Sequence, residues 1–232
     1  MSEGAGAPRP PLPRVVLASA SPRRRDLLAA LGLTFDVRPV DLDETPRPGE
    51  EPRAYVARLA GEKAATDVRP GELVLAADTV VVLPGEPPEL LGKPSGPAEA
   101  EAMLARLAGR EHTVLTGVAL TRGEAGVGPP AVVVEESRVR IAALGPQEIA
   151  WYVATGEPLD KAGAYAIQGV GALFVEAVSG NYTNVVGLPL PAVYRLFAGA
   201  GHDLRDFLRV PRPVRIAPTA DDSLTSSRSR RP

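Results

Sequence analysis

The chain has 232 residues, of which 44% are hydrophobic, and its formal net charge at pH 7 is −2. This length is enough for one sizeable core, and the slightly negative charge argues against a protein that coats a nucleic acid polymer. Cysteine is absent, which excludes disulfides and thiolate metal sites. No apolar run approaches the roughly 18 residues of a membrane span, and residues 1–13 lack the apolar core of a secretory signal. We therefore expect a cytoplasmic protein with no membrane or nucleic acid polymer as partner.

The first two predicted elements are a short apolar strand over residues 14–18 and a helix over residues 22–31. Ser21 suits the N-cap of this helix and Pro22 its first position. The helix start combines unpaired backbone N–H groups, a positive dipole end, Arg23 and Arg24, which together favour an anion such as a phosphate. An ordinary capped surface helix with solvated arginines is the alternative.

The following elements alternate between strand and helix patterns and predict an α/β fold. We expect strands at 34–39, 72–83, 112–121, 131–141 and 172–178, and helices at 50–66, 97–108, 146–154 and 189–198. Residues 84–95, rich in Pro and Gly, predict a loop, and residues 122–130 predict the connection of a hairpin. Residues 1–13 are expected to be flexible, and the tail from residue 205 to residue 232 is expected to be disordered.

Two charged residues fall on faces that should be buried. Lys63 shares a helical face with Val56, Leu59 and Ala60, and a lysine that points inward needs an anion. Asp78 lies in an otherwise apolar strand, where an ionised carboxylate must be paired, bound to metal or neutralised. For Asp78, a structural hydrogen bond at a strand end is the alternative.

An acidic segment, residues 41–45, follows the strand predicted at 34–39 and contains Asp41, Asp43 and Glu44. Carboxylate oxygens near a helix can hold a hard cation such as Mg²⁺, although an acidic loop can equally be only solvated. Walker loops, zinc-binding His-Glu-x-x-His helices and Gly-x-Ser-x-Gly elbows are absent from the sequence. The residues thus indicate a phosphate site, with the acidic groups as partners.

Several motifs, in this order, resemble the Maf family of nucleoside triphosphate pyrophosphatases. They are Ser-Ala-Ser-Pro-Arg-Arg-Arg-Asp-Leu-Leu at 19–28, Glu-Lys-Ala at 62–64, Ala-Ala-Asp-Thr at 76–79, Leu-Gly-Lys-Pro at 91–94, Leu-Asp-Lys-Ala-Gly-Ala-Tyr at 159–165, Ile-Gln-Gly at 167–169 and Val-Gly-Leu-Pro at 186–189. The resemblance spans about residues 15–197 and is far more specific than any one motif. It implies a single catalytic domain over residues 14–204, with a mixed sheet flanked by helices in an elongated two-lobed molecule, similar to inosine triphosphate pyrophosphatases.

The activity that the resemblance implies is hydrolysis of a nucleoside triphosphate between its α and β phosphates, with a divalent cation, Mg²⁺ or Mn²⁺, as cofactor. Members are often homodimers. The subfamily that acts on dTTP and UTP carries Arg, Thr and Gln at three selective positions, which match Arg24, Thr79 and Gln168. The sister subfamily, which acts on 7-methyl-GTP, is expected to differ at all three. A nucleotide-binding regulator of septum formation is a rival from another functional class.

The resemblance also implies individual roles. Asp78 matches the catalytic aspartate, as a proton acceptor, a metal ligand or both. The phosphate and metal positions match Ser19, Arg23, Glu44, Lys63 and Lys93, and the residues themselves add Ser21 to the phosphate set. Because Asp43 is next to Glu44, the sequence does not decide which of the two carboxylates binds the cation. Asp160 and Lys161 are either a structural ion pair or substrate ligands.

Overall fold

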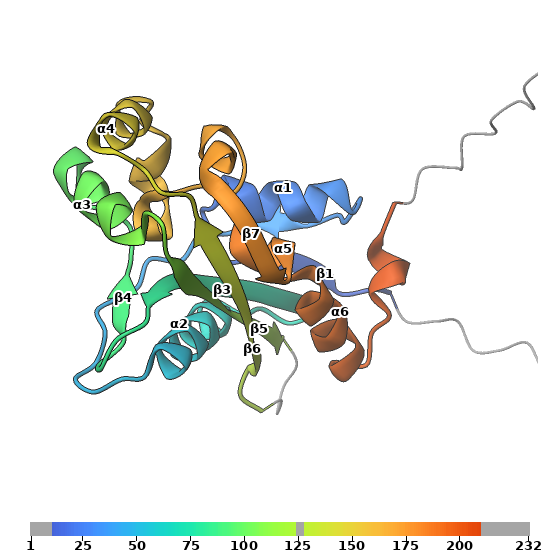
Figure 1. Cartoon of the computed structure of the whole chain (residues 1–232). Helices are drawn as coiled ribbons and strands as arrows, with labels where there is room; N and C mark the ends of the chain where they lie inside the picture. Colours follow the sequence, from blue (N-terminus) through green and yellow to red (C-terminus); the bar gives the residue numbers. More distant parts are fainter. Residues whose placement is uncertain (1–10, 124–127, 210–232) are drawn as a thin grey trace, which may run out of the picture.

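The computed structural model describes residues 11–123 and 128–209 (Figure 1). The strands in this part of the chain are β1 Arg14–Leu17, β2 Asp36–Val37, β3 Glu72–Leu83, β4 Glu89–Leu91, β5 Glu111–Arg122, β6 Ala131–Ile141 and β7 Val175–Gly180. The α-helices are α1 Pro22–Ala30, α2 Pro52–Ala65, α3 Pro97–Leu107, α4 Pro146–Ala154, α5 Tyr182–Val186 and α6 Leu190–Gly199. Short 3-10 helices lie at Glu157–Asp160, Ala162–Ala164, Val170–Phe174 and Leu204–Phe207. The expected α/β class is confirmed.

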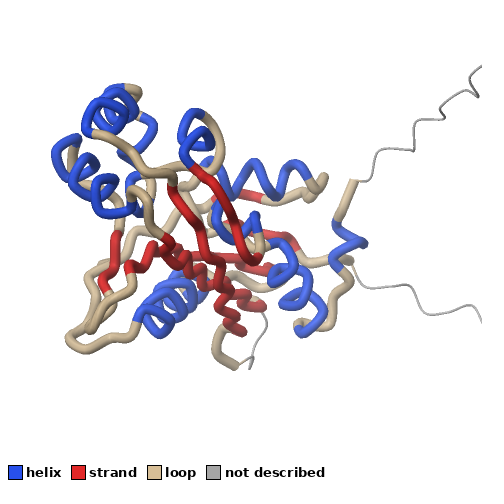
Figure 2. Tube along the Cα trace, in the orientation of Figure 1, coloured by secondary structure: helices blue, strands red, loops and turns tan. Residues whose placement is uncertain are grey.

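All seven strands form one mixed sheet, which occupies the centre of the molecule (Figure 2). The order is β2-β1-β3-β5-β6-β7, and β4 pairs separately with β3. β1 runs parallel to β2 and β3, whereas every other pair is antiparallel. The long strands β3, β5 and β6 therefore form the frame to which the shorter elements attach.

Helix α2 covers one face of the sheet (Figure 1). Side chains alternate between faces along a strand, so the even-numbered residues of β3 point toward this helix. Val74 and Ala76 pack with Ala60 and Ala64, and further along the strand Val80 packs with Leu59. The apolar face predicted for α2 is confirmed, with Lys63 buried on it.

The opposite face carries two separate hydrophobic clusters. At one end, Leu73, Leu75 and Ala77 of β3 pack against α1 and α6. At the other end, Val81 and Leu83 pack against α3 and α4. Thr79 lies between these two parts of the strand. This division of the core into two ends is the feature of the structure that corresponds to the expected two lobes.

Gly117 allows α2 to approach the sheet closely. It lies in β5 directly opposite Asp78 of β3. A Cβ atom at Gly117 would lie 2.2 Å from the backbone oxygen of Val56 in α2. Val56 and Lys63 are two helical turns apart on one face, so the glycine brings the lysine-bearing face onto the strand that carries Asp78.

Most predicted elements match, and the differences have local causes. The strand expected at 172–178 is wrong in its first half, because the backbone N–H groups of Val170 and Gly171 donate to the Glu157 carboxylate and the chain forms a 3-10 helix there. The strand expected at 34–39 shortens to the two residues of β2. The loop expected at 84–95 contains β4, and α5 was not predicted. Both elements are too short to show a periodic pattern of apolar residues in the sequence.

The expected tail begins too early at residue 205. Leu204 and Phe207 are buried, and the ring centroids of Phe207 and Phe197 are 5.3 Å apart, so these residues belong to the core. The rest of the predicted tail, residues 210–232, and residues 1–10 of the predicted N-terminal extension lie outside the described residues, as do residues 124–127 of the hairpin connection. Within the described ranges, none of the helices has the length and apolar character needed to cross a membrane.

Candidate active site

One edge of β3 is open at its middle. On that edge β1 pairs with residues 72–75 and β4 pairs with residues 81–83, while β5 covers the other edge throughout this region. Residues 76–80 are thus flanked by the end of β1, at Leu17, and the end of β4, at Leu91. Ligands of α/β proteins commonly bind where the strand order leaves such a gap. We call residues 76–80 the open edge of β3.

A cavity of about 470 Å³ lies at this open edge. Its lining includes all ten residues predicted for the site: Ser19, Ser21, Arg23, Arg24, Glu44, Lys63, Asp78, Thr79, Lys93 and Gln168. These residues come from the segment between β1 and α1, the start of α1, the loop before α2, α2 itself, β3, the segment after β4, and the segment after the 3-10 helix Ala162–Ala164. The structure therefore brings the predicted set together in one place.

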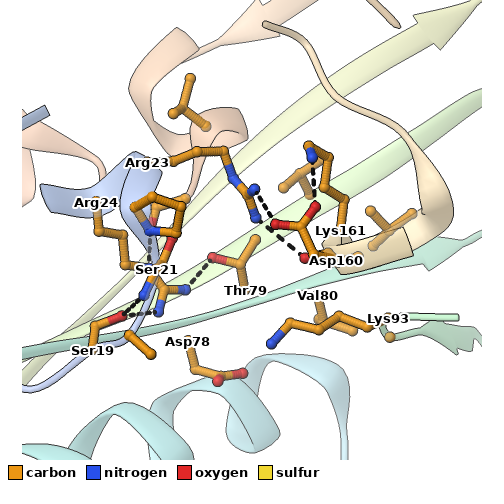
Figure 3. A pocket seen from close by; sticks show the side chains of 18 of the residues that line it. Ser19, Ser21, Arg23, Arg24, Asp78, Thr79, Val80, Lys93, Asp160 and Lys161 are labelled. Carbon is orange, nitrogen blue, oxygen red and sulfur yellow. Dashed lines mark hydrogen bonds and ion pairs between the residues drawn. The ribbon is translucent and has the colours of Figure 1, made fainter. Parts of the chain in front are cut away.

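Asp78 and Thr79 point to opposite faces of the sheet because they are neighbours in a strand. Asp78 faces α2, whereas Thr79 faces α1 and α5 (Figure 3). Only at a strand edge can one ligand reach both faces. The cavity therefore has an end with carboxylates and lysines and an end next to Thr79.

Lys63 joins the two carboxylates at the first end. Its Nζ lies 2.7 Å from Asp78 Oδ1 and 2.5 Å from Glu44 Oε1. The side chains of Lys63 and Asp78 are only 8% and 10% exposed, so each depends on the other for compensation of its charge. Burial opposes ionisation of Glu44, but the hydrogen bond and charge of Lys63 outweigh it and lower the pKa of that carboxyl.

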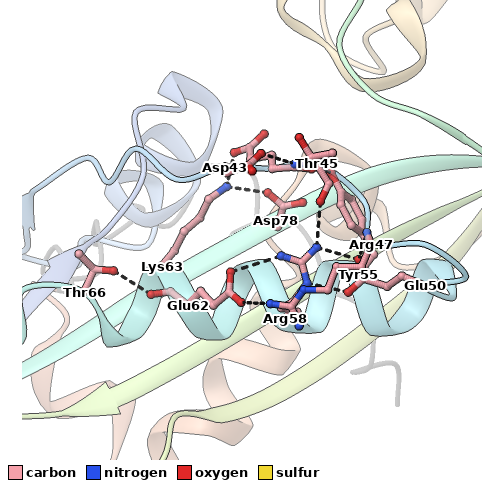
Figure 4. A network of polar contacts seen from close by, with 11 residues as sticks. Asp43, Thr45, Arg47, Glu50, Tyr55, Arg58, Glu62, Lys63, Thr66 and Asp78 are labelled. Carbon is pink, nitrogen blue, oxygen red and sulfur yellow. Dashed lines mark hydrogen bonds and ion pairs between the residues drawn. The ribbon is translucent and has the colours of Figure 1, made fainter.

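The loop that carries Glu44 is held by side chains of α2 (Figure 4). The Tyr55 hydroxyl donates to the backbone oxygen of Glu44 over 2.8 Å, and Arg58 donates to the backbone oxygen of Thr45. Asp43 accepts from the Thr45 N–H at 2.9 Å, whereas Glu44 accepts from Lys63. Of the two neighbouring carboxylates, Glu44 is therefore the one that contacts the buried lysine.

The start of α1 forms the next wall of the cavity. Ser21 occupies the N-cap position as predicted, but its hydroxyl makes no capping bond. Its backbone N–H donates instead to Ser19 Oγ at 3.2 Å. The first N–H groups of a helix have no partner within the helix, so this end, with Ser19 and Ser21, can bind an anion.

Arg24 is held rigidly in the wall. Its Nε donates to the backbone oxygen of Gly187 at 2.8 Å, Nη1 to Ser19 Oγ at 3.2 Å and Nη2 to Thr79 Oγ1 at 3.1 Å (Figure 3). Burial lowers the pKa of its guanidinium, and the Asp78 charge opposes this effect. Arg25, the next residue, is exposed beside Asp26, so the three arginines of the motif have different environments.

Arg23 faces Asp160 across the cavity. Its Nη1 lies 2.9 Å from Asp160 Oδ2, and Lys161 Nζ lies 2.5 Å from Asp160 Oδ1 (Figure 3). Burial would raise the pKa of Asp160, but Lys161 and Arg23 outweigh it and lower that pKa. The Asp160–Lys161 pair left open by the sequence is thus an ion pair that also lines the cavity.

Lys93 and Gln168 complete the lining. Lys93 is exposed and follows β4; in Figure 3 its side chain extends toward Asp78. The preceding Gly92 oxygen accepts the Gly163 N–H at 3.0 Å, which fixes this segment. Gln168 is exposed, and the apolar side chains of Ile167 and Val186 also line the cavity.

Sequence reasoning missed Tyr55 and the link between Arg23 and Asp160. Tyr55 was detectable, since residues 55, 59 and 63 recur every four positions on one face of α2. The link between Arg23 and Asp160 joins residues 137 positions apart, and no local pattern announces it.

The fold and the cavity define a class: an α/β protein with a pocket at an open strand edge. In the part of the chain that the structure describes, five cationic side chains and four carboxylates line this pocket, which suits a ligand with several phosphates and a bound cation. The family model described as "Maf-like protein" matches residues 14–200, and the chain belongs to this family.

Curated relatives agree with this assignment. A protein of Anaeromyxobacter dehalogenans strain 2CP-C is 56% identical over 192 residues, which cover 83% of this chain and 96% of the relative. A protein of Myxococcus xanthus is 54% identical over 189 residues, covering 81% and 92%, and one of Moorella thermoacetica is 52% identical over 194 residues, covering 82% and 97%. All three relatives are named dTTP/UTP pyrophosphatase.

Proposed function

We propose that this chain is a nucleoside triphosphate pyrophosphatase that hydrolyses dTTP and UTP to the nucleoside monophosphate and pyrophosphate, in the cytoplasm. The observation that carries the proposal is Asp78, a carboxylate at the open edge of β3 with cationic side chains on both sides of it. A protein that only binds an anion has no need for a buried carboxylate in its pocket, because that charge repels the ligand. The names of the relatives support the choice of bases.

The carboxylates also suit a divalent cation. Among the described residues, no group of three or more His, Cys, Asp or Glu side chains could hold a metal ion by itself. Glu44 and Asp78 offer hard oxygen donors, and Mg²⁺ is typically bound through one or two carboxylates plus phosphate oxygens of the substrate. Glu44 and Asp78 would hold Mg²⁺ or Mn²⁺ together with the triphosphate. The cation would supply Lewis-acid polarisation of the phosphate and acidification of bound water.

Asp78 has the chemistry of a proton acceptor. In the proposed reaction a water oxygen forms a bond to the α-phosphorus, and its proton passes to the Asp78 carboxylate. The bond from the α-phosphorus to the oxygen bridging to the β-phosphate breaks, and that oxygen leaves with the electron pair as part of pyrophosphate. Lys63, whose Nζ lies 2.7 Å from Asp78 Oδ1, orients the carboxylate before the transfer.

Cations of the cavity would bind the triphosphate chain. Arg23 and Lys93, with the N–H groups at the start of α1 beside Ser19 and Ser21, surround the space next to Asp78. Fixed positive groups stabilise the charge that accumulates on a leaving pyrophosphate. Arg23 is pre-oriented for this role by its bond to Asp160.

The other end of the cavity would receive the base. Arg24, Thr79 and Gln168 offer hydrogen-bond donors and acceptors there, next to the apolar side chains of Ile167 and Val186. A uracil or thymine ring needs both a flat apolar contact and polar partners at its edge.

The proposal includes a homodimer. The side chains of Trp151 and Leu173 are 54% and 74% exposed and supply apolar surface for association. A measurement of the oligomeric state in solution tests this part of the proposal.

The deciding experiment is release of pyrophosphate from each ribo- and deoxyribonucleoside triphosphate, with Mg²⁺ or Mn²⁺ and with a chelator as control. We expect release mainly from dTTP and UTP, and loss of it with the chelator. Asp78→Asn keeps an oxygen that Lys63 can donate to, so the fold should persist while turnover falls by about 100-fold or more. Asp36→Asn, on the surface strand β2, is the matched control and should retain activity. Release mainly from 7-methyl-GTP contradicts the choice of bases, and no release from any triphosphate contradicts the enzymatic function.

A further inference from the structure

A chain of hydrogen bonds leads from the cavity into the core. Arg24 Nη2 donates to Thr79 Oγ1 at 3.1 Å, Thr79 Oγ1 lies 3.0 Å from Thr116 Oγ1, and Thr116 Oγ1 donates to the backbone oxygen of Asn184 at 3.1 Å. Thr116 lies in β5 directly opposite Thr79 and is fully buried. It does not line the cavity. Its hydroxyl therefore acts on a ligand indirectly, and its hydrogen bond to a cavity residue is the one with Thr79.

The direction of these bonds is fixed by counting hydrogens. A threonine hydroxyl has a single hydrogen, and a backbone oxygen can only accept. Thr116 must give its hydrogen to Asn184, so Thr79 must give its own to Thr116. Thr79 also accepts a hydrogen from Arg24, which leaves one lone pair on Thr79 Oγ1. Toward anything that enters the cavity, the Thr79 hydroxyl is then an acceptor and not a donor.

We infer that Thr116 is a positioning residue for base selection: it holds the Thr79 hydroxyl as an acceptor and so favours a base that presents a ring N–H. This inference rests on the proposed function. Uracil and thymine carry a hydrogen on the ring nitrogen between their two carbonyl groups, whereas the same nitrogen of cytosine is an acceptor. A hydroxyl without a hydrogen to donate leaves that cytosine nitrogen unpaired, which a buried site disfavours.

We expect the core to tolerate removal of this hydroxyl. The Asn184 backbone oxygen also accepts the Gly187 N–H at 2.9 Å, so it keeps a partner when Thr116 is replaced. Valine has nearly the shape of threonine, and Thr116→Val leaves the β5 backbone pairing intact. Without the Thr116 oxygen, the Thr79 hydroxyl can turn its hydrogen into the cavity and donate to a cytosine nitrogen.

The chain offers a matched control on the same strand. Thr121 also lies in β5, and its buried hydroxyl has no hydrogen-bond partner among the described residues. Thr121→Val therefore makes the same chemical change without touching the hydrogen-bond chain. Thr116→Ser, in turn, keeps the hydroxyl and loses only a methyl group.

The test compares kcat/KM for UTP and CTP in the wild type and in these variants, with thermal unfolding as a check on the fold. We expect the UTP-to-CTP ratio to fall by about tenfold in Thr116→Val, the factor that one hydrogen bond supplies, and to stay within twofold in Thr116→Ser and Thr121→Val. Thr116→Ala replaces Thr116→Val if the latter does not fold, with the same expectation.

Three results overturn the inference: an unchanged ratio in a folded Thr116→Val or Thr116→Ala, a ratio lowered equally by Thr121→Val, or a ratio lost in Thr116→Ser. Failure of the proposed function looks different, because it appears in the wild type as absence of pyrophosphate from UTP and dTTP before any variant is made.

Discussion

Lys63 and Asp78 form a nearly buried ion pair, with 2.7 Å between Nζ and Oδ1, across the interface between α2 and β3. The same nitrogen contacts Glu44 at 2.5 Å. One lysine thus compensates two carboxylates, and its removal would leave both negative charges facing each other. Lys63 Nζ therefore contributes both to the charge balance in the cavity and to the packing of α2 on the sheet.

Lys63→Met tests this dependence. The methionine keeps an apolar stem, but Asp78 loses its buried counter-charge, so we expect the free energy of unfolding to fall by about 3 kcal/mol in urea denaturation. Arg53→Met is the control: Arg53 lies on the exposed side of α2, 3.9 Å from Glu136, and should cost less than about 1 kcal/mol. Equal losses for the two variants would contradict the proposed charge balance.

Glu50 predicts a pH dependence of stability. The hydrogen bond from Arg58 lowers the pKa of Glu50 from 4.5 to about 2. A carboxyl with a lowered pKa in the folded state contributes stability above its unfolded pKa and loses it as the pH falls through the folded value. The stability difference between the wild type and Glu50→Gln should therefore be complete above pH 4.5 and disappear near pH 2.

Unfolding of both proteins across this pH range checks the expectation. Glu51→Gln, at the neighbouring exposed position that receives none of the Arg58 hydrogen bonds, is the control variant. A Glu50→Gln difference that stays constant down to pH 2 would mean that the Arg58 bond does not act through ionisation of Glu50.

Tyr55→Phe removes the bond from the Tyr55 hydroxyl to the Glu44 backbone oxygen. Burial, with the charges of Asp78 and Glu44, raises the pKa of Tyr55 to about 12, so the hydroxyl keeps its hydrogen at neutral pH and donates it. Without this bond the loop should position the Glu44 carboxylate less precisely for a cation. The Mg²⁺ concentration for half-maximal pyrophosphate release should therefore rise by about tenfold. Tyr182→Phe, exposed in α5, is the control and should leave it unchanged.

Gly117→Ala tests the close approach of α2 to the sheet. The added Cβ would meet the Val56 backbone oxygen, which cannot move away as a flexible side chain could. We expect a loss of about 1–3 kcal/mol in unfolding free energy together with reduced activity. Gly61→Ala is the control, because its Cβ would lie 3.6 Å from Val132 Cγ2, and alanine should stabilise this helix position by about 0.5–1 kcal/mol.

The sequence is enough to predict the buried charges but not what connects them. Lys63 and Asp78 stand out because each interrupts a local apolar pattern, and the structure confirms that they pair. Thr116 has no such signal, since threonine is common in strands, and its partners lie 37 and 68 positions away. Its role depends on the register of β3 with β5, which one sequence does not specify.

Element boundaries show the same limit. The long strand Glu72–Leu83 matches its predicted bounds because a continuous apolar run defines it. The start of β7 was misplaced because Glu157, 13 positions before Val170, bonds to the backbone there and delays the strand. The resemblance to a family supplied the grouping of the site residues that local patterns could not.

The open edge of β3 has a consequence for association between molecules. Unpaired strand edges at a protein surface invite strands of other copies to add to them, which leads to aggregation. Here the length left unpaired by β1 and β4 is only residues 76–80, and these two strands cap it on both sides along the same edge. A foreign strand is too long to fit between these two ends, whereas a small molecule is not. The fold thereby leaves part of this edge, Asp78 to Val80, facing a cavity of nucleotide size while it keeps the edge from templating a growing sheet.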